Sequence, residues 1–247
     1  MWRVSRLSIM LIGVLLGVGL WLQPGTAAAS KLILPLGDVS YISPQTVQAW
    51  TGAEVEMALG EHELVEFAVV ILSNVPYGGL PGAVQERLTE FLTRGGSLLI
   101  TGGASAYGSG GYKAMANLIP FEIRAEEDWR AVPFKPVIPL QPGHPILQGV
   151  TFQSMGAFND LNPKPGAMEI AQYAGGKTTR GARYPSPLIA EQRVGQGTVL
   201  GIAFDLGQEI QSGWTDGSLF LQNLLTYLVN RSPLVPKPKE DQRGEVR

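Results

Sequence analysis

The stretch that most constrains the fold of this chain is residues 66–101, which reads as a strand, a helix and a second strand. Glu66–Leu72 is a continuous apolar run rich in β-branched residues, typical of a strand covered on both faces, as in a parallel sheet. Residues 84–92 place apolar side chains on one helical face and polar side chains on the other. Ser97–Thr101 is another apolar run. Two buried strands joined by one helix predict a parallel crossover unit.

The remaining patterns extend this unit into one domain. They predict strands at Lys31–Leu36, Glu54–Leu59 and Met168–Tyr173, helices at Pro44–Trp50, Lys113–Leu118 and Ser218–Asn230, and a hairpin of Pro187–Gln192 and Thr198–Phe204. Five prolines between residues 133 and 145 restrict Glu122–Arg130 and Pro133–Leu140 to irregular or edge-strand structure. The order predicts a doubly wound α/β domain with a mostly parallel sheet, made mixed by the C-terminal hairpin.

The N-terminus has the pattern of a secretory signal. Arg3 and Arg6 precede the apolar stretch Leu7–Leu22, and Ala27–Ala29 supplies the small residues that a signal peptidase requires. We expect cleavage after Ala29 and an extracytoplasmic protein, periplasmic or secreted. The alternative is an uncleaved anchor, in which residues 7–22 hold the protein to the membrane.

The chain therefore divides into three parts. Residues 1–29 are the signal peptide or anchor, residues 30–232 form the α/β domain, and residues 233–247, rich in proline and charge, are predicted to be a disordered tail.

Composition excludes several classes of function. The net charge is -2 and the body of the chain has no basic run, so we expect no nucleic-acid partner. The chain has no cysteine, which excludes disulfides, thiolate metal sites and a cysteine nucleophile. His62 and His144 are the only imidazoles. The acidic side chains between Glu122 and Asp128 are interpreted as a solvated surface, so we expect no metal and no cofactor.

A glycine-rich segment follows the strand Ser97–Thr101. Its glycines are Gly102, Gly103, Gly108, Gly110 and Gly111. The backbone N–H groups of these glycines could bind an anion. Their order matches neither the P-loop nor the dinucleotide-binding motif, so a sharp turn out of the sheet is the favoured interpretation.

Several segments in order resemble a known family. They are VVILSNVP, GGSLLITGG, SAYGSGGY, HPIL and PLIAEQRVGQGTVLGIAFD, followed by a tryptophan. Together, over most of residues 66–230, they resemble the glutamine amidotransferase-like domains, relatives of the class I glutamine amidotransferases with a flavodoxin-like fold. The resemblance implies that a catalytic member would carry its nucleophilic cysteine directly after Ser97–Thr101. Here that turn reads Gly102, Gly103, Ala104 and Ser105, so we assign no catalytic residue.

Ser105 could in principle replace the missing thiol. A hydroxyl near a tight turn can attack an acyl group when an imidazole accepts its proton. GGASA departs from the G-x-S-x-G elbow, however, and the resemblance implies that His144, in HPIL, is a structural residue.

Open α/β sheets bind ligands beyond the carboxyl ends of their strands. The candidate pocket residues by this argument are Ser73, Asn74, Gly103, Ser105, Tyr107, Asp205 and Trp214. Asp205 and Trp214 could equally be a turn carboxylate and a covering aromatic ring.

Three functions remain open at this stage. The first is a non-catalytic binding module of the cell envelope, whose small-molecule or protein partner is unknown. The second is an amidase or hydrolase that uses Ser105 or a water held by Asp205. The third is a structural module that docks on another protein through an apolar surface or the tail.

Overall fold

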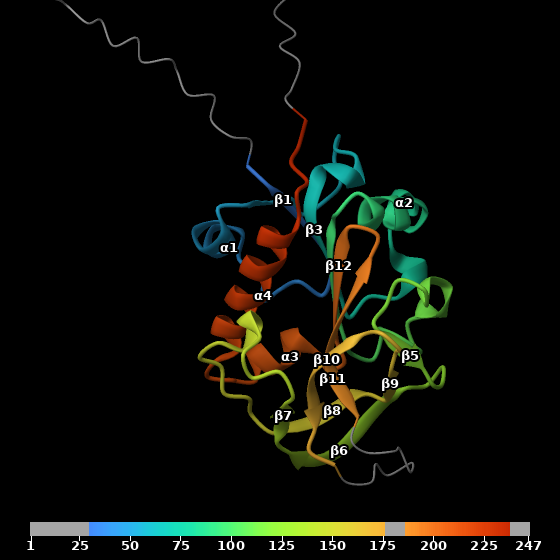
Figure 1. Ribbon diagram of the computed structural model, residues 1–247, viewed down its shortest axis with the longest axis vertical. Helices are drawn as coiled ribbons and strands as arrows, with labels where there is room; N and C mark the ends of the chain where they lie inside the picture. Colours follow the sequence, from blue (N-terminus) through green and yellow to red (C-terminus); the bar gives the residue numbers. More distant parts are fainter. Residues whose placement is uncertain (1–29, 176–185, 238–247) are drawn as a thin grey trace, which may run out of the picture.

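The computed structural model describes residues 30–175 and 186–237, which form an α/β domain around one mixed sheet (Figure 1). The strand order is β2-β1-β3-β4-β12-β11-β10-β7. Strands β1 (Leu32–Gly37), β2 (Glu54–Val55), β3 (Phe67–Ser73), β4 (Ser97–Thr101) and β12 (Gly197–Ile202) are parallel, whereas β11 (Pro187–Val194), β10 (Met168–Tyr173) and β7 (Val137–Pro139) are antiparallel. The predicted fold class is confirmed.

Helices cover both faces of the parallel half of the sheet (Figure 1). Helices α1 (Pro44–Thr51) and α4 (Gly217–Arg231) pack against each other on one face, and α2 (Gly82–Thr93) lies on the other. A short helix α3 (Leu206–Gln211) follows β12. Single 3₁₀ turns are η1 (Leu64–Glu66), η2 (Tyr77–Gly79), η3 (Tyr112–Met115) and η4 (Pro145–Leu147).

The predicted unit of residues 66–101 is present as β3, α2 and β4. Every residue of β3 and of β4 is buried, because helices cover both faces of these strands. The apolar side chains of α2 form its buried face, namely Val84, Leu88, Phe91 and Leu92. The paired strands run parallel, with Val69 opposite Ser97 and Ser73 opposite Thr101.

Several elements differ from the sequence prediction. Strand β2 is only two residues long, because its pairing with β1 ends where Val55 lies opposite Ile33, and Met57 is exposed. The helix predicted at Lys113–Leu118 is the 3₁₀ turn η3. Two small antiparallel pairs, which the sequence pattern did not predict, are β5 (Phe121–Ile123) with β9 (Leu161–Pro163) and β6 (Trp129–Lys135) with β8 (Met155–Asn159).

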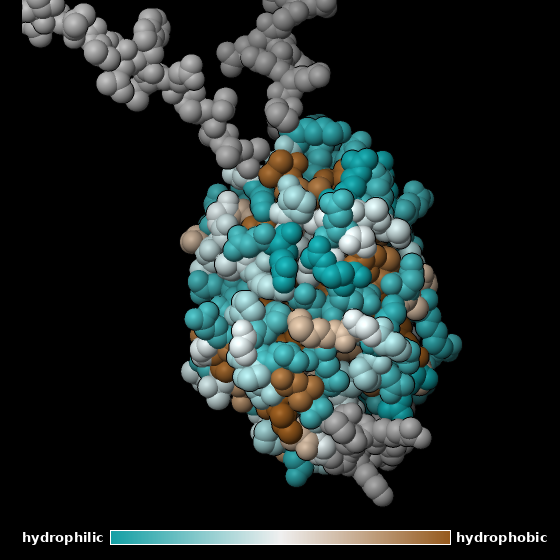
Figure 2. Space-filling model, in the orientation of Figure 1, coloured by the Kyte–Doolittle hydropathy of each residue, from teal (hydrophilic) through white to brown (hydrophobic). Residues whose placement is uncertain are grey.

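These small pairs lie together with β7 and β10 at one end of the molecule, opposite the end where the described chain starts and stops (Figure 1). The face drawn in Figure 2 is mainly hydrophilic, with small separate apolar areas. Within the described residues, no helix is long and apolar enough to cross a membrane.

The predicted signal segment and the last ten residues lie outside the described residues, so the predictions for residues 1–29 and 238–247 are not addressed by the structure. The described beginning of the predicted tail, residues 233–237, contains no helix or strand. Leu234 is partly buried against the core.

Candidate functional site

The carboxyl ends of β1, β3, β4 and β12 meet at one edge of the sheet, where a hydroxyl cluster is buried. Ser73 Oγ accepts hydrogen bonds from Tyr41 Oη at 3.1 Å and from Thr101 Oγ1 at 3.2 Å. Burial raises the pKa of Tyr41 well above its ordinary value, so the phenol stays protonated at neutral pH. Ser73 itself has no exposed surface. Ser73, a predicted pocket residue, is therefore buried and joins Tyr41 to Thr101 through hydrogen bonds.

Asn74 joins three segments of this edge. Its backbone adopts a left-handed conformation, with φ of 43°, which asparagine tolerates better than most residues. The side-chain Oδ1 accepts a hydrogen bond from Ser105 N at 2.8 Å, and Nδ2 donates to Asp205 Oδ2 at 2.9 Å. The Asn74 amide thus fixes the turn after β4 to the turn after β12.

The turn directly after β4 leaves no space for a side chain at its first two positions. A Cβ atom on Gly102 would lie 2.5 Å from Asn159 Oδ1, and one on Gly103 would lie 2.2 Å from Asn74 Oδ1. Gly103 also has φ of 137°, where other residues are strained. Asn159 binds the Gly103 backbone on both sides, accepting from its N–H at 2.9 Å and donating to its carbonyl at 3.1 Å.

Asp128 holds the rest of the glycine-rich segment. Its carboxylate accepts hydrogen bonds from Gly108 N at 3.0 Å, Ser109 N at 3.2 Å and Asn159 Nδ2 at 3.1 Å. Burial raises the pKa of Asp128, and these hydrogen bonds oppose the rise. The interpretation of this acidic stretch as solvated surface is wrong for Asp128, which is completely buried. One of the N–H groups considered for an external anion, that of Gly108, therefore already binds a carboxylate of the protein.

Asp205 is the N-cap of α3. Its Oδ1 accepts from Gln208 N at 3.0 Å, and its Oδ2 accepts from Asn74. Burial raises the pKa of this carboxyl, more than the hydrogen bond from Gln208 N lowers it. Helix α3 was not predicted, although an Asp followed by a short polar and apolar stretch was a usable signal.

Tyr107 and Trp214 pack inside the domain. Tyr107 is fully buried, with φ of 45°, and donates a hydrogen bond to the carbonyl of Ile202 at 2.9 Å. The Trp214 ring stacks on Phe152 with ring centres 5.3 Å apart, and its indole N–H donates to Thr151 O at 2.8 Å. Trp214 therefore has the position of a covering aromatic ring.

Ser105 has no imidazole partner within the described residues. His144 Nε2 lies 3.6 Å from Glu191 Oε2, its Nδ1 accepts from Ile146 N at 3.4 Å, and its ring packs on Tyr227. His62 Nδ1 lies 2.8 Å from Glu66 Oε2. The nucleophile and base of a serine hydrolase are not brought together in this arrangement.

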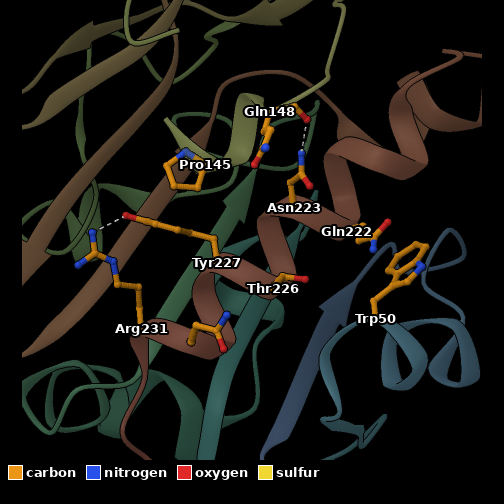
Figure 3. Close-up of a pocket in the computed structure, with 9 residues that line it drawn as sticks. Trp50, Pro145, Gln148, Gln222, Asn223, Thr226, Tyr227 and Arg231 are labelled. Atoms are coloured by element: carbon orange, nitrogen blue, oxygen red, sulfur yellow. Dashed lines mark hydrogen bonds between the residues drawn. The ribbon is translucent and has the colours of Figure 1, made fainter. Parts of the chain in front are cut away.

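Three hollows of similar size lie in the described surface. One of about 440 Å³ beside α3 is lined by Phe134, Gln153, Ser154, Gly156, Ala157, Gln208, Glu209 and Ser212. One of about 550 Å³ beside the glycine-rich segment is lined by Gly108, Ser109, Gly111, Lys113, Glu126 and Glu127. The third, about 450 Å³, lies over α4 (Figure 3). None of the seven predicted pocket residues lines any of these three, so ligand binding by those residues stays a prediction.

No group of three or more His, Asp or Glu side chains in the described chain could hold a metal ion.

Comparison with known proteins places the fold in a class. No protein-family profile matches the chain, and no curated protein matches it. Among solved structures, the cytoplasmic proteins STM3548 and STM1381 of Salmonella typhimurium superpose with TM-scores of 0.62 and 0.61, at 16% and 14% identity. They cover 80% and 81% of this chain, and 98% and 99% of their own length is covered.

A ThuA-like protein of Bacteroides uniformis superposes with a TM-score of 0.52 at 12% identity, covering 87% of this chain and 98% of its own. At such low identity these likenesses describe the fold alone. They show an α/β domain with a flavodoxin-like architecture, similar to that of a ThuA-like protein.

Proposed function

We propose that this protein is an exported, non-catalytic relative of the class I glutamine amidotransferases that acts as a binding module in the cell envelope. The observation that carries the proposal is the filled turn after β4. Asn159 and Asn74 occupy the space that a side chain at Gly102 or Gly103 would need. A nucleophilic side chain at Gly102 would require Asn159 and the Ala203 backbone to move, and one at Gly103 would require Asn74 to move.

The chemistry of the edge supports the same conclusion. Acyl transfer requires a nucleophile, a base within hydrogen-bond reach and donors aimed at the developing oxyanion. The N–H groups of Gly103, Ser105 and Gly108 are instead bound by Asn159, Asn74 and Asp128. The polar groups of the turn are thus used to hold its conformation.

An assay of ammonia release from glutamine tests the absence of catalysis. We expect no turnover above background from the purified mature protein and an unchanged melting temperature in Ser105→Ala, since the Ser105 contact uses its backbone N–H. Turnover by the wild type that is lost in Ser105→Ala would overturn the proposal.

The binding role is tested separately by melting temperature in the presence of a metabolite panel. A ligand that binds only the native state increases the unfolding free energy, by roughly 2.7 kcal/mol when its concentration is a hundred times Kd. The melting temperature rises as a result. A panel without any shift would favour the structural module over the binding module.

A hydrolase remains the second candidate because of Asp205. The Asp205 side chain lies where the parallel strands end, and burial raises its pKa. A raised pKa is a property of many general bases. The matched variant is Asp205→Asn, which keeps the size of the side chain. Hydrolysis of amide or ester substrates that is present in the wild type and absent in Asp205→Asn would establish this candidate in place of the first.

The export part of the proposal rests on residues 1–29. Sequencing the protein purified from its host is expected to give Ser30 as the first residue. A chain that still begins at Met1 would instead indicate an anchor or no export.

A further inference from the structure

A groove of about 450 Å³ lies over the outer face of α4, on the helix layer that covers one face of the sheet (Figure 3). One wall is Trp50 at the end of α1, and the opposite wall is Pro145 of η4 and Gln148 directly after it. The floor is formed by α4 residues, namely Gln222, Asn223, Thr226, Tyr227, Asn230 and Arg231. The groove shares no residue with the site described above at the carboxyl ends of the parallel strands.

Neutral polar side chains dominate the groove, and no carboxylate lines it. Asn223 Nδ2 donates to the backbone oxygen of Gln148 at 2.9 Å. The side chains of Gln222, Thr226 and Asn230 form no hydrogen bond with any other described residue. Their donors and acceptors therefore remain available to a ligand.

The one cation of the groove is already engaged. Arg231 donates a hydrogen bond to Tyr227 Oη at 2.8 Å, and its guanidinium lies 5.0 Å from the centre of the Tyr227 ring. Tyr227 Oη in turn donates to the buried Glu191 Oε2 at 2.8 Å. This chain of contacts fixes the floor before any ligand arrives, which lowers the entropic cost of binding.

This set of side chains matches the chemistry of a neutral sugar. Every sugar hydroxyl is both a donor and an acceptor, and carboxamides and the threonine hydroxyl offer both, whereas a carboxylate only accepts and an ammonium only donates. The face of an indole ring packs against the C–H surface of a pyranose ring as it does against other apolar surfaces. The volume lies within the range of small-molecule sites, which begins at about 300 Å³.

We propose that the groove over α4 binds a neutral saccharide of one or two rings, with Trp50 packed against a ring face and Thr226 and Asn230 bonded to its hydroxyls. The proposal does not depend on the absence of catalysis, because the groove and the carboxyl edge are built from different residues.

Calorimetric titration with neutral disaccharides of glucose, galactose and N-acetylglucosamine tests it. The wild type is expected to bind at least one of them. The double variant Thr226→Val and Asn230→Leu, which keeps the number and branching of the side-chain heavy atoms while removing the hydrogen bonds, is expected to bind at least about tenfold more weakly, a loss of roughly 1.4 kcal/mol. The matched control Gln141→Leu removes an exposed amide outside the groove and should bind like the wild type.

The melting temperature of each variant shows whether it folds. If the double variant does not fold, the pair Trp50→Phe and Trp50→Ala provides the comparison, since only the first retains an aromatic face. Failure of every saccharide at tens of millimolar, equal binding by the wild type and the folded variants, or a polar peptide that binds the groove when saccharides do not would each overturn the proposal.

Discussion

At the scale of single residues, the filled turn after β4 makes Gly103 unusually sensitive. Gly103→Ala introduces strain at φ of 137° and a Cβ atom 2.2 Å from Asn74 Oδ1. We expect a loss of about 3 kcal/mol or more of unfolding free energy, since backbone strain and overpacking add. Gly52→Ala is the matched control, because Gly52 has φ of 70° but no atom near its Cβ position, and it should cost only about 1 kcal/mol. Urea denaturation of both variants measures the difference, and equal losses would contradict the account of the turn.

The buried carboxyl groups of Asp205 and Glu191 are expected to make the unfolding free energy depend on pH in opposite directions. Burial raises the pKa of Asp205, so the folded state holds this proton more tightly than the unfolded state. Burial alone would raise the pKa of Glu191 too, but the neighbouring His144 and the hydrogen bond from Tyr227 bring it below its ordinary value.

Relative to Asp205→Asn, wild-type unfolding free energy should therefore fall as pH rises from about 4, the ordinary range of an aspartate, through the raised pKa. Relative to Glu191→Gln, it should rise with pH through the lowered pKa and be lost in more acidic solution. Urea titrations of the three proteins across this range give the two slopes. Slopes of the same sign would show that these carboxyls do not have the environments described.

At the scale of elements, the sequence predicted those parts whose pattern repeats within one segment. The apolar run of β3 and the striped helix α2 both show their burial locally, so their positions agree with the structure to within two residues. The strands β8 and β9 and the polar contacts of Asp128 and Asn159 depend on partners far along the chain. No local period marks such residues, and so the side chains that fix the turn at Gly103 could not be identified from the sequence.

The packing of α2 gives a prediction of its own. Phe91 is fully buried, with its ring against Gly96, and Phe91→Ala should cost about 3–5 kcal/mol of unfolding free energy. The same substitution at Phe134 on β6, which is 75% exposed, should cost less than about 0.5 kcal/mol. Thermal unfolding of the two variants compares one chemical change in two environments. A comparable loss at Phe134 would mean that this ring is covered in the folded protein.

At the scale of the whole molecule, the two ends of the described chain lie together at one end of the domain (Figure 1). The first strand begins directly after the expected cleavage site, and Lys31 Nζ donates to the backbone oxygens of Val229 at 2.7 Å and Ser232 at 2.5 Å, at the end of α4. A cation at a helix C-terminus also interacts favourably with the helix dipole. The mature chain would therefore keep these two hydrogen bonds only if cleavage leaves Lys31 in place.

Lys31→Met retains the aliphatic length of the side chain and removes the charge that joins β1 to α4. We expect it to lower the unfolding free energy by about 1 kcal/mol, the size of a partly exposed charged hydrogen bond. A chain that ends at residue 237 should melt at the same temperature as one that ends at residue 247, because the contacts of this end involve Val229, Ser232 and Leu234. Calorimetry of both, each beginning at Ser30, distinguishes the contributions. If truncation at residue 237 destabilised the domain as much as Lys31→Met, the last ten residues would have to bind it, and the prediction of a disordered tail would be wrong.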